Sequence, residues 1–311
     1  MSTAPEERSS TPTSRVVDTN GVRLHVRVAG PEDGPLVLLL HGFPEASHGW
    51  RHQIPYLAAA GYRVWAPDQR GYGASDKPER IAAYGLDVLA DDVTGLIDAA
   101  GRRQAAVVGH DWGGAVAWHV ARRAPQRVSK LVVLNVPHPS VMRAHLRTNL
   151  AQFRRSLYIL AFQLPWFPER LLGRRDGRAL ARALVATSRP GTFGRDDLAE
   201  YRRSWSAPNT IRAMLDWYRA ALRHPPARGS ASRVGVPTLL VWGAKDRFLG
   251  SEMARPSIEL CDDGRLVVIE SATHWLQHEE PDRVGALIDA FVRDGGAVSS
   301  AGSGGEAPGG D

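Results

Sequence analysis

Residues 107–114, with the sequence VVGHDWGG, place one acidic side chain where a predicted strand turns sharply into a predicted helix. The order glycine, any residue, nucleophile, any residue, glycine is typical of a nucleophile elbow, which lifts one side chain above a sheet. The nucleophile here is Asp111, where an esterase or lipase would have serine. A carboxylate with a pKa near ~4 is ionised at neutral pH and needs no base in order to attack. The residue type favours displacement at an sp³ carbon with a strained or good leaving group, which esterifies Asp111.

An ester of Asp111 must be hydrolysed before the next turnover, and that step needs a general base. The candidate base is His274, which follows the predicted strand 266–269. We predict that Asp246, in the loop after the predicted strand 238–242, holds the imidazole in one tautomer and stabilises its protonated form. Each of the three side chains thus follows a predicted strand, in the order nucleophile, acid, base along the chain.

Backbone donors for the hydrolytic step are predicted at two places. The sequence LHGFP at residues 40–44 follows a buried strand, and Trp112 follows the nucleophile. We predict that the N–H groups of Phe43 and Trp112 form an oxyanion hole for the tetrahedral intermediate. We also expect a cis peptide bond before Pro44, because tight turns favour it.

Short apolar runs bounded by glycine and proline recur along the chain and are predicted to be strands. Most are rich in valine or leucine without polar alternation, as in strands buried on both faces of a mostly parallel sheet. Helical patterns at 86–100, 114–123 and 281–292 separate several of them, and this alternation predicts a doubly wound α/β fold. The predicted strands are 23–28, 36–40, 63–66, 105–108, 131–134, 238–242 and 266–269.

One stretch interrupts the alternation of strands and helices. Residues 137–232 contain no convincing strand and several helix-like segments with aromatic side chains, so we predict a helical cap inserted into the core. Such an insertion would cover the carboxyl ends of the core strands, where open α/β sheets bind ligands. The core then comprises residues 15–136 and 233–294. Residues 1–14 and 295–311 are rich in small and polar residues and are expected to be disordered tails.

The composition narrows the class of protein. With 311 residues, 43% of them apolar, the chain can bury a substantial core, and we recognise neither a secretory signal nor a membrane span. The net charge of +6 comes from arginines that are scattered along helix-like segments, so we expect solvated surface charge and no nucleic-acid partner.

The cysteine and metal-ligand patterns narrow the class of protein further. Cys261 is the only cysteine, which excludes internal disulfides and fits a soluble protein of the reducing cytoplasm. Its place before a turn favours a structural thiol over a nucleophile. No convincing metal-ligand spacing or glycine-rich phosphate loop is recognisable, so we expect no metal and no cofactor.

Four motifs together resemble those of the α/β-hydrolase-fold epoxide hydrolases of the soluble and microbial type. They are HGFP at 41–44, DQRGYG at 68–73, GHDWGG at 109–114, and His274-Trp275 followed by Gln277. The resemblance runs from about residue 15 to 294 and implies that water converts a small apolar epoxide to a vicinal diol. Family members can carry the acid after the preceding strand instead, but that place holds Asn135 here, so Asp246 remains the predicted acid.

The leaving group separates this activity from that of haloalkane dehalogenases, which share the same nucleophile, acid and base. A halide leaves unprotonated, whereas an epoxide oxygen leaves as an alkoxide-like centre that a general acid should assist. The resemblance implies two cap tyrosines for this purpose, and Tyr158 and Tyr218 stand in matching sequence contexts. A phenol of pKa about 10 keeps its proton at neutral pH and can donate it. Fluoroacetate-type dehalogenases follow the nucleophile with arginine, whereas this chain has Trp112.

Two other functions stay open at this point. One is a haloalkane or haloacid dehalogenase on the same core, and the other is a non-catalytic small-molecule-binding protein of the same fold. The two cap tyrosines could also be packing residues, since both lie in apolar helical segments. His41 and His110 are expected to hydrogen-bond locally, and Asp68 and Arg70 to act as a loop-organising pair rather than in catalysis.

Overall fold

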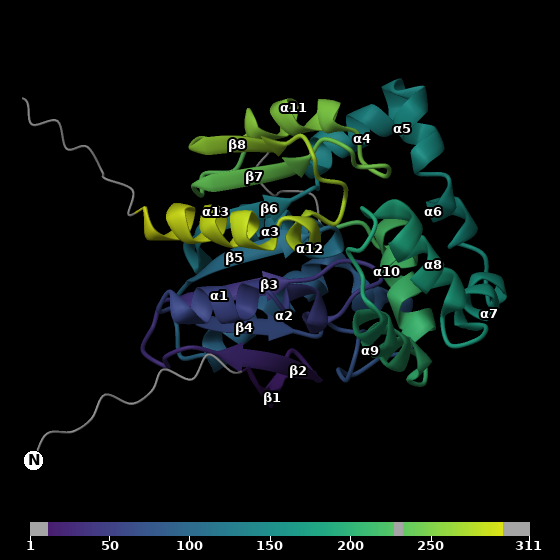
Figure 1. Ribbon diagram of the computed structural model, residues 1–311, viewed down its shortest axis with the longest axis horizontal. Coiled ribbons are helices and arrows are strands. Elements are labelled where there is room, and N and C mark those ends of the chain that lie inside the picture. Colours follow the sequence, from purple (N-terminus) through teal and green to yellow (C-terminus); the bar gives the residue numbers. More distant parts are fainter. Residues whose placement is uncertain (1–11, 227–232, 295–311) are drawn as a thin grey trace, which may run out of the picture.

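The computed structural model describes residues 12–226 and 233–294, which form one twisted sheet with helices on both faces (Figure 1). The strands are β1 (Thr13–Thr19), β2 (Val22–Ala29), β3 (Leu36–Leu40), β4 (Arg63–Pro67), β5 (Ala105–His110), β6 (Val128–Leu134), β7 (Thr238–Gly243) and β8 (Gly264–Ile269). Their order in the sheet is β1-β2-β4-β3-β5-β6-β7-β8. The pairs β1–β2 and β2–β4 are antiparallel and the other neighbours are parallel. The predicted α/β fold with a mostly parallel sheet is confirmed.

Helices of the core flank this sheet. They are α1 (Gln53–Ala59), α2 (Leu86–Ala99), α3 (Trp112–Arg123), α11 (Ala254–Ile258), α12 (Leu276–Glu279) and α13 (Pro281–Arg293). Four short 3-10 turns join them: η1 (Ser47–Trp50), η2 (Ile81–Tyr84), η3 (Pro125–Arg127) and η4 (Ser251–Met253). In the described part of the chain, no helix has the length and apolarity needed to cross a membrane.

Consecutive side chains of the central strand β3 point to opposite faces of the sheet and pack against different helices. Leu38 and Leu40 belong to the apolar cluster that includes side chains of α2 and α3. Val37 and Leu39 belong to the cluster that includes side chains of α1 and α13. All five residues of β3 are buried, which explains why this run is apolar throughout and does not alternate.

The edge strand β1 is absent from the sequence prediction. Its residues are mostly exposed and only Val17 is buried, so the segment has no apolar run that would reveal it. It pairs with β2 in a register that sets Thr13 opposite Val28. The folded core therefore begins at Thr13 rather than at residue 15. Residues 1–11 and 295–311 of the predicted tails lie outside the described residues.

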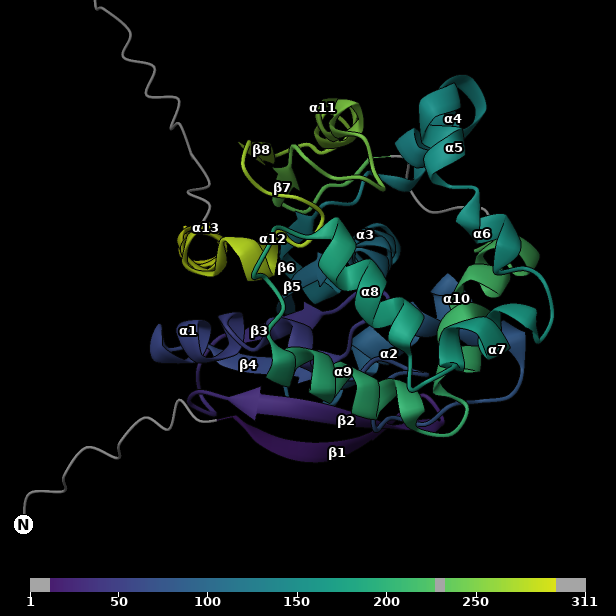
Figure 2. The ribbon, with the colours of Figure 1, turned by 45° about the vertical axis from the view of Figure 1, so that its right-hand side comes forward.

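A helical insertion lies between β6 and β7, at one end of the sheet (Figures 1 and 2). Its described residues form no strand. Two tryptophans tie it to the core, because Trp205 donates a hydrogen bond to the carbonyl of Pro44 and Trp217 to that of Arg70. The helices are α4 (Pro139–Thr148), α5 (Leu150–Arg155), α6 (Tyr158–Ala161), α7 (Phe167–Gly173), α8 (Arg178–Thr187), α9 (Arg195–Ser206) and α10 (Thr210–Arg223). We refer to this insertion as the cap; residues 227–232 of the predicted cap lie outside the described residues.

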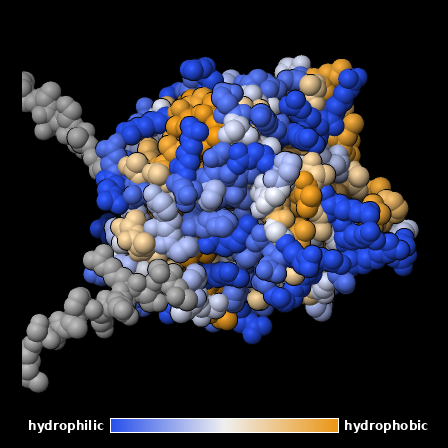
Figure 3. Space-filling model, viewed as in Figure 1, coloured by the Kyte–Doolittle hydropathy of each residue, from blue (hydrophilic) through white to orange (hydrophobic). Residues whose placement is uncertain are grey.

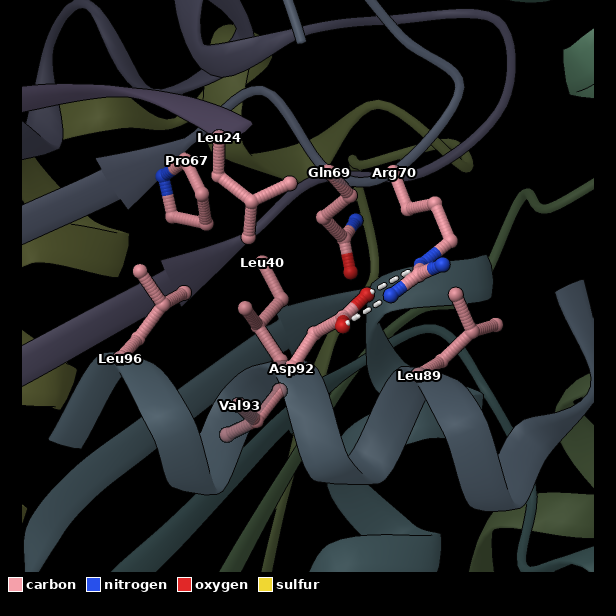
Figure 4. Close-up of a pocket in the computed structure, with 9 residues that line it drawn as sticks. All are labelled: Leu24, Leu40, Pro67, Gln69, Arg70, Leu89, Asp92, Val93 and Leu96. Carbon is pink, nitrogen blue, oxygen red and sulfur yellow. Dashed lines mark hydrogen bonds and ion pairs between the residues drawn. The ribbon is translucent and has the colours of Figure 1, made fainter. Parts of the chain in front are cut away.

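Two charged side chains organise the loop after β4, each with its own partner. Arg70 donates hydrogen bonds of 2.8 and 2.6 Å to the two oxygens of Asp92 on α2, beside a small space with apolar walls (Figure 4). Burial raises the pKa of Asp92, although Arg70 opposes that shift. Asp68 instead accepts from the N–H groups of Ser47 and Ala74. Asp68 and Arg70 therefore both organise this loop, as expected, but through separate partners.

Candidate active site

Asp111 occupies the sharp turn between β5 and α3, with φ 49° and ψ −120°. Such a backbone conformation is uncommon for a residue with a side chain and is often found at functional sites. It directs the carboxylate into a cavity between the core and the cap. The side chain is 17% exposed, so it is shielded from bulk water but accessible from the cavity. This backbone geometry is that of a nucleophile elbow.

Three glycines make this turn sterically feasible. A Cβ atom on Gly109 would stand 2.3 Å from the carbonyl oxygen of Gly113, and one on Gly113 would stand 2.1 Å from that of Leu40. A Cβ atom on Gly42 would stand 2.3 Å from the Cβ of Asp111. Because these distances are far inside van der Waals contact, any side chain at these positions would push the turn at Asp111 out of place.

His274 and Asp246 follow β8 and β7 and meet Asp111 at the carboxyl ends of the strands. Nδ1 of His274 lies 2.7 Å from Oδ2 of Asp246, and since a carboxylate only accepts, Nδ1 is the donor. Nε2 of the same ring lies 3.6 Å from Oδ2 of Asp111. The structure therefore brings the three predicted side chains together, with the imidazole between two carboxylates.

The carboxylate of Asp246 is held by several donors. Oδ1 of Asp246 accepts from the N–H groups of Phe248 and Leu249 at 2.7 and 3.0 Å. Oδ2 accepts from the side-chain amide of Asn135 at 2.9 Å, in addition to the bond from His274. The carboxylate is thus fixed in one orientation, which in turn fixes the imidazole ring.

Asn135 has a structural role that the sequence analysis did not predict. Its amide nitrogen donates to Asp246 and to the carbonyl of Thr273, and its oxygen accepts from the N–H group of Gly243 at 2.6 Å. It therefore joins the loops after β6, β7 and β8. The sequence signal was present, because a polar residue directly after a buried strand lies at the edge of the sheet where the predicted site is.

The charges of the three side chains depend on one another. Burial alone would lower the pKa of His274, but the negative charges of Asp246 and Asp111 raise it to about 10. Burial alone would raise the pKa of Asp111, but His274 and the N–H group of Phe43 hold it below its usual value. At neutral pH the site therefore contains an ionised Asp111 next to a protonated His274.

One oxygen of the Asp111 carboxylate is held by the backbone. The N–H group of Phe43 donates to Oδ1 of Asp111 at 2.7 Å, which leaves Oδ2 facing His274. The peptide bond between Phe43 and Pro44 is cis, as predicted. Trp112 begins α3, and N–H groups of a first helical turn have no partner within the helix. Its place in an oxyanion hole stays a prediction.

Two cap tyrosines line the same cavity as Asp111 and His274. Tyr158 begins α6 and Tyr218 lies on α10, with ring centroids 6.1 Å apart. Burial raises the pKa of both phenols, and the negative charge of Asp111 adds to the shift. Each phenol therefore keeps its proton at neutral and alkaline pH and can donate it to a bound oxygen atom.

The cavity itself has a volume of ≈ 200 Å³. Beyond the residues already described, apolar side chains of the cap make up much of its wall, among them Phe162, Leu172, Leu180 and Leu184. Pockets of this kind, apolar with a few convergent polar groups, bind small apolar molecules and orient one reactive atom.

A buried carboxylate near the site was also missed by sequence reasoning. Glu45 follows Pro44, and its side chain is fully buried. It accepts from Nε2 of His278 at 2.7 Å, from the amide of Gln277 at 3.1 Å and from the hydroxyl of Tyr201 in the cap at 2.5 Å. Burial alone would raise the pKa of Glu45, but His278 and other partners hold it well below its usual value. The sequence does contain a signal for this site, because Glu45 is an acidic residue directly after the predicted turn motif at 41–44.

This network reaches the backbone of the predicted base. The amide of Gln277 donates to Nδ1 of His110 at 3.1 Å, and Nε2 of His110 donates to the carbonyl of His274 at 2.8 Å. His110 therefore hydrogen-bonds locally, as expected. His41 does the same, since its Nδ1 lies 3.0 Å from the carbonyl of Gly42.

Other reactive side chains contribute little to the site. Cys261 is buried, and burial raises the pKa of its thiol to about 11, as suits a structural cysteine. Among the described residues, no group of three or more histidine, cysteine, aspartate or glutamate side chains could hold a metal ion. Among the described residues that line the cavity, the titratable side chains are Asp111, His274, Tyr158 and Tyr218.

Known proteins resemble this chain over nearly its whole folded length. The profile of the alpha/beta hydrolase fold family matches residues 35–281. The AB hydrolase superfamily protein YfhM of Bacillus subtilis is 46% identical over 278 residues, covering 89% of this chain and 97% of that protein. Epoxide hydrolase 4 of Mus musculus is 38% identical over 284 residues, covering 89% of this chain and 78% of that protein.

Solved structures give the same result. An epoxide hydrolase of Bacillus megaterium, in complex with an inhibitor, superimposes with a TM-score of 0.82 at 31% sequence identity. The match covers 90% of this chain and 100% of the Bacillus megaterium chain. The resemblance first read from four short motifs is thus confirmed at the level of the whole fold.

The charge coupling in the site predicts how His274 responds when Asp111 loses its charge. In Asp111→Asn a neutral amide replaces the carboxylate, so the pKa of His274 should fall well below 10, because one of the two charges that raise it is gone. Titration of the His274 ring by NMR measures this, with Asp98→Asn, an exposed carboxylate on α2, as the matched control. An unchanged pKa in Asp111→Asn would contradict the coupling.

Proposed function

Because this chain belongs to the α/β hydrolase fold family, and within it to the epoxide hydrolases, we propose that it adds water to an apolar epoxide through an ester on Asp111. It is accordingly a hydrolase that acts on ether bonds, and its product is a vicinal diol. The single observation that carries the proposal is that Asp111, His274, Tyr158 and Tyr218 line one apolar cavity.

In the first step, Oδ2 of Asp111 attacks an epoxide carbon. One observation supports this choice of atom: the N–H group of Phe43 engages Oδ1 and leaves Oδ2 without that bond. The carbon–oxygen bond of the ring breaks, and Tyr158 and Tyr218 donate a proton to the departing oxygen. Esterification removes the negative charge of Asp111, so the pKa of His274 falls and the proton it releases restores the phenol.

In the second step, the neutral His274 takes a proton from water, which attacks the carbonyl carbon of the ester. Oδ1 carries the developing negative charge, and the N–H group of Phe43 already points at it. Collapse of the tetrahedral intermediate releases the diol and leaves Asp111 ionised beside a protonated His274. One epoxide and one water are consumed, and the site returns to the charge state that its pKa values favour.

The cap tyrosines favour an epoxide over a halide as the leaving group. A halide departs without a proton, so it would gain little from two phenols whose protons are tightly held. Both phenols line the cavity with the nucleophile, and their raised pKa values keep them as donors at neutral pH. The apolar wall of the cap supports an apolar substituent on the epoxide.

The covalent step predicts that the base variant traps the ester. His274→Ala should react once with an epoxide and gain the mass of that epoxide, because the ester forms but is not hydrolysed. Asp111→Ala should neither turn over nor gain mass, and His145→Ala, the same change on the cap helix α4, should behave like the unmodified chain. Intact-protein mass spectrometry measures the mass of all three variants after exposure to the epoxide. The absence of an adduct on His274→Ala, with an epoxide that the unmodified chain hydrolyses, would contradict the scheme.

The acid role of the tyrosines predicts slower ring opening. Tyr158→Phe or Tyr218→Phe should lower the rate of Asp111 alkylation by about tenfold or more, and the double variant by ~10²–10⁴ in line with general acid catalysis. Tyr62→Phe, whose hydroxyl bonds to Asp289 away from the cavity, is the matched control. Single-turnover alkylation is measured by stopped flow. If the double variant alkylates at the unmodified rate, the phenols are packing residues.

A further inference from the structure

One edge of the cap exposes large apolar side chains. Eight of them, between Leu150 and Leu171 on α5, α6, α7 and the adjoining loops, are 44–65% exposed. Elsewhere in the described residues only four large apolar side chains are exposed. Figure 3 shows apolar surface along the edge that carries these helices in Figure 1, with hydrophilic surface between. We call these eight side chains the cap patch; apolar surface of this kind usually marks a site of contact with another molecule.

Trp166 is the most exposed member of the cap patch. It is 65% exposed, and it alone among the nine tryptophans of the chain is classed as exposed. Its φ of 48° lies in the left-handed region, which bulky residues avoid. The guanidinium of Arg170 lies 5.6 Å from the centre of its ring, so an aromatic side chain and a cation are presented together. A strained and exposed aromatic residue is better explained by an external partner than by internal packing.

The excess positive charge of the chain lies in the segment that carries the cap patch. Residues 139–185 contain nine arginines and two acidic residues, a net charge of +7, whereas the whole chain carries +6. The nine arginines are all exposed, and none forms an ion pair within the described part of the chain. The two acidic residues, Glu169 and Asp176, pair with arginines of α10 and α9 instead. Outside this segment the chain is close to neutral, so the expectation of evenly scattered arginines is wrong, and the excess lies in one segment of the cap.

We propose that the cap patch docks on an anionic lipid bilayer. Exposed leucine and aromatic side chains set among arginines are typical of surfaces that lie in the membrane interface. There the apolar side chains enter the headgroup boundary, and the arginines contact acidic headgroups. The exposed apolar side chains of α5, α6 and α7 would enter the headgroup boundary. The arginines of the same segment, which form no ion pair with any described residue, would contact the acidic headgroups.

A second copy of this chain fits the cap patch less well. Most homodimers have two-fold symmetry, which would set each patch against its own copy. The excess positive charge of one segment would then face that of the other and repel it. An acidic headgroup layer supplies the opposite charge over the same area.

The docking surface adjoins the cavity of the site. α6 supplies Tyr158 to the cavity wall and α7 supplies Leu172, and both helices also carry members of the cap patch. Docking would hold this side of the cap against the bilayer, where apolar molecules concentrate. That consequence rests on the proposed function, whereas the docking itself does not.

Vesicle flotation tests the docking with the full chain. We expect the chain to float with phosphatidylcholine vesicles that contain phosphatidylglycerol, to bind them more weakly at high salt, and not to float with pure phosphatidylcholine. Brominated lipid should quench tryptophan fluorescence, because Trp166 is the exposed tryptophan. Trp166→Phe should lose most of this quenching and still float.

A matched pair of variants separates a specific surface from general attraction. Arg154→Glu/Arg155→Glu on α5 should weaken vesicle binding at least about tenfold. Arg103→Glu/Arg283→Glu makes the same charge change at exposed arginines of the core and should bind like the unmodified chain. Neither pair lines the cavity, so both should hydrolyse a water-soluble epoxide at the unmodified rate. If the unmodified chain hydrolyses no epoxide but still floats with anionic vesicles, the proposed function fails and the docking stands.

Three outcomes would overturn the docking proposal. The first is a failure of the unmodified chain to float with any anionic vesicle. A second is equal weakening by the two paired variants, which would mean that only the net charge matters. The third is a dimer in sedimentation velocity that Trp166→Ser dissociates, which would assign the cap patch to a second copy of this chain.

Discussion

One ion pair determines the chemistry that this site can perform, that of the His274 imidazolium with Asp111. The second carboxylate, Asp246, lies on the other side of the ring and helps to raise its pKa to about 10. In the proposed cycle the proton leaves the ring when Asp111 becomes an ester and returns when water hydrolyses that ester. In that proposed cycle the same coupling keeps Asp111 ionised before the first step and makes His274 a base for the second.

The sheet and its loops hold this ion pair in place. Asp111, Asp246 and His274 each follow a parallel strand, and Asn135, after a fourth strand, bonds to the loops that carry the last two. The cap closes over the ion pair and adds two phenols to the cavity. Tyr201 of the cap reaches the buried Glu45, so the cap is tied to the core by a charged hydrogen bond as well as by packing.

The sequence predicted those parts of the fold that depend on local patterns. Buried strands such as β3 are uninterrupted apolar runs, and the glycines around Asp111 mark a turn that no larger residue can make. Prediction from the sequence failed where the neighbours of a residue come from distant segments of the chain. The edge strand β1 has one buried side chain and no pattern, and the roles of Asn135 and Glu45 follow from partners more than a hundred residues away. The excess of arginine in residues 139–185 can be counted in the sequence, but the exposure of these side chains and their lack of ion pairs among the described residues follow only from the fold.

Product analysis with matched substrates tests the central claim most directly. The purified chain is incubated with a panel of aryl and alkyl epoxides and with bromoalkanes of the same carbon skeletons, and diol and free bromide are measured. The account predicts diol from the epoxides and no bromide from the bromoalkanes, because the cap phenols assist an oxygen that leaves with a proton. Bromide without diol would contradict it, and would mean that Tyr158 and Tyr218 pack against the cavity without acting as acids.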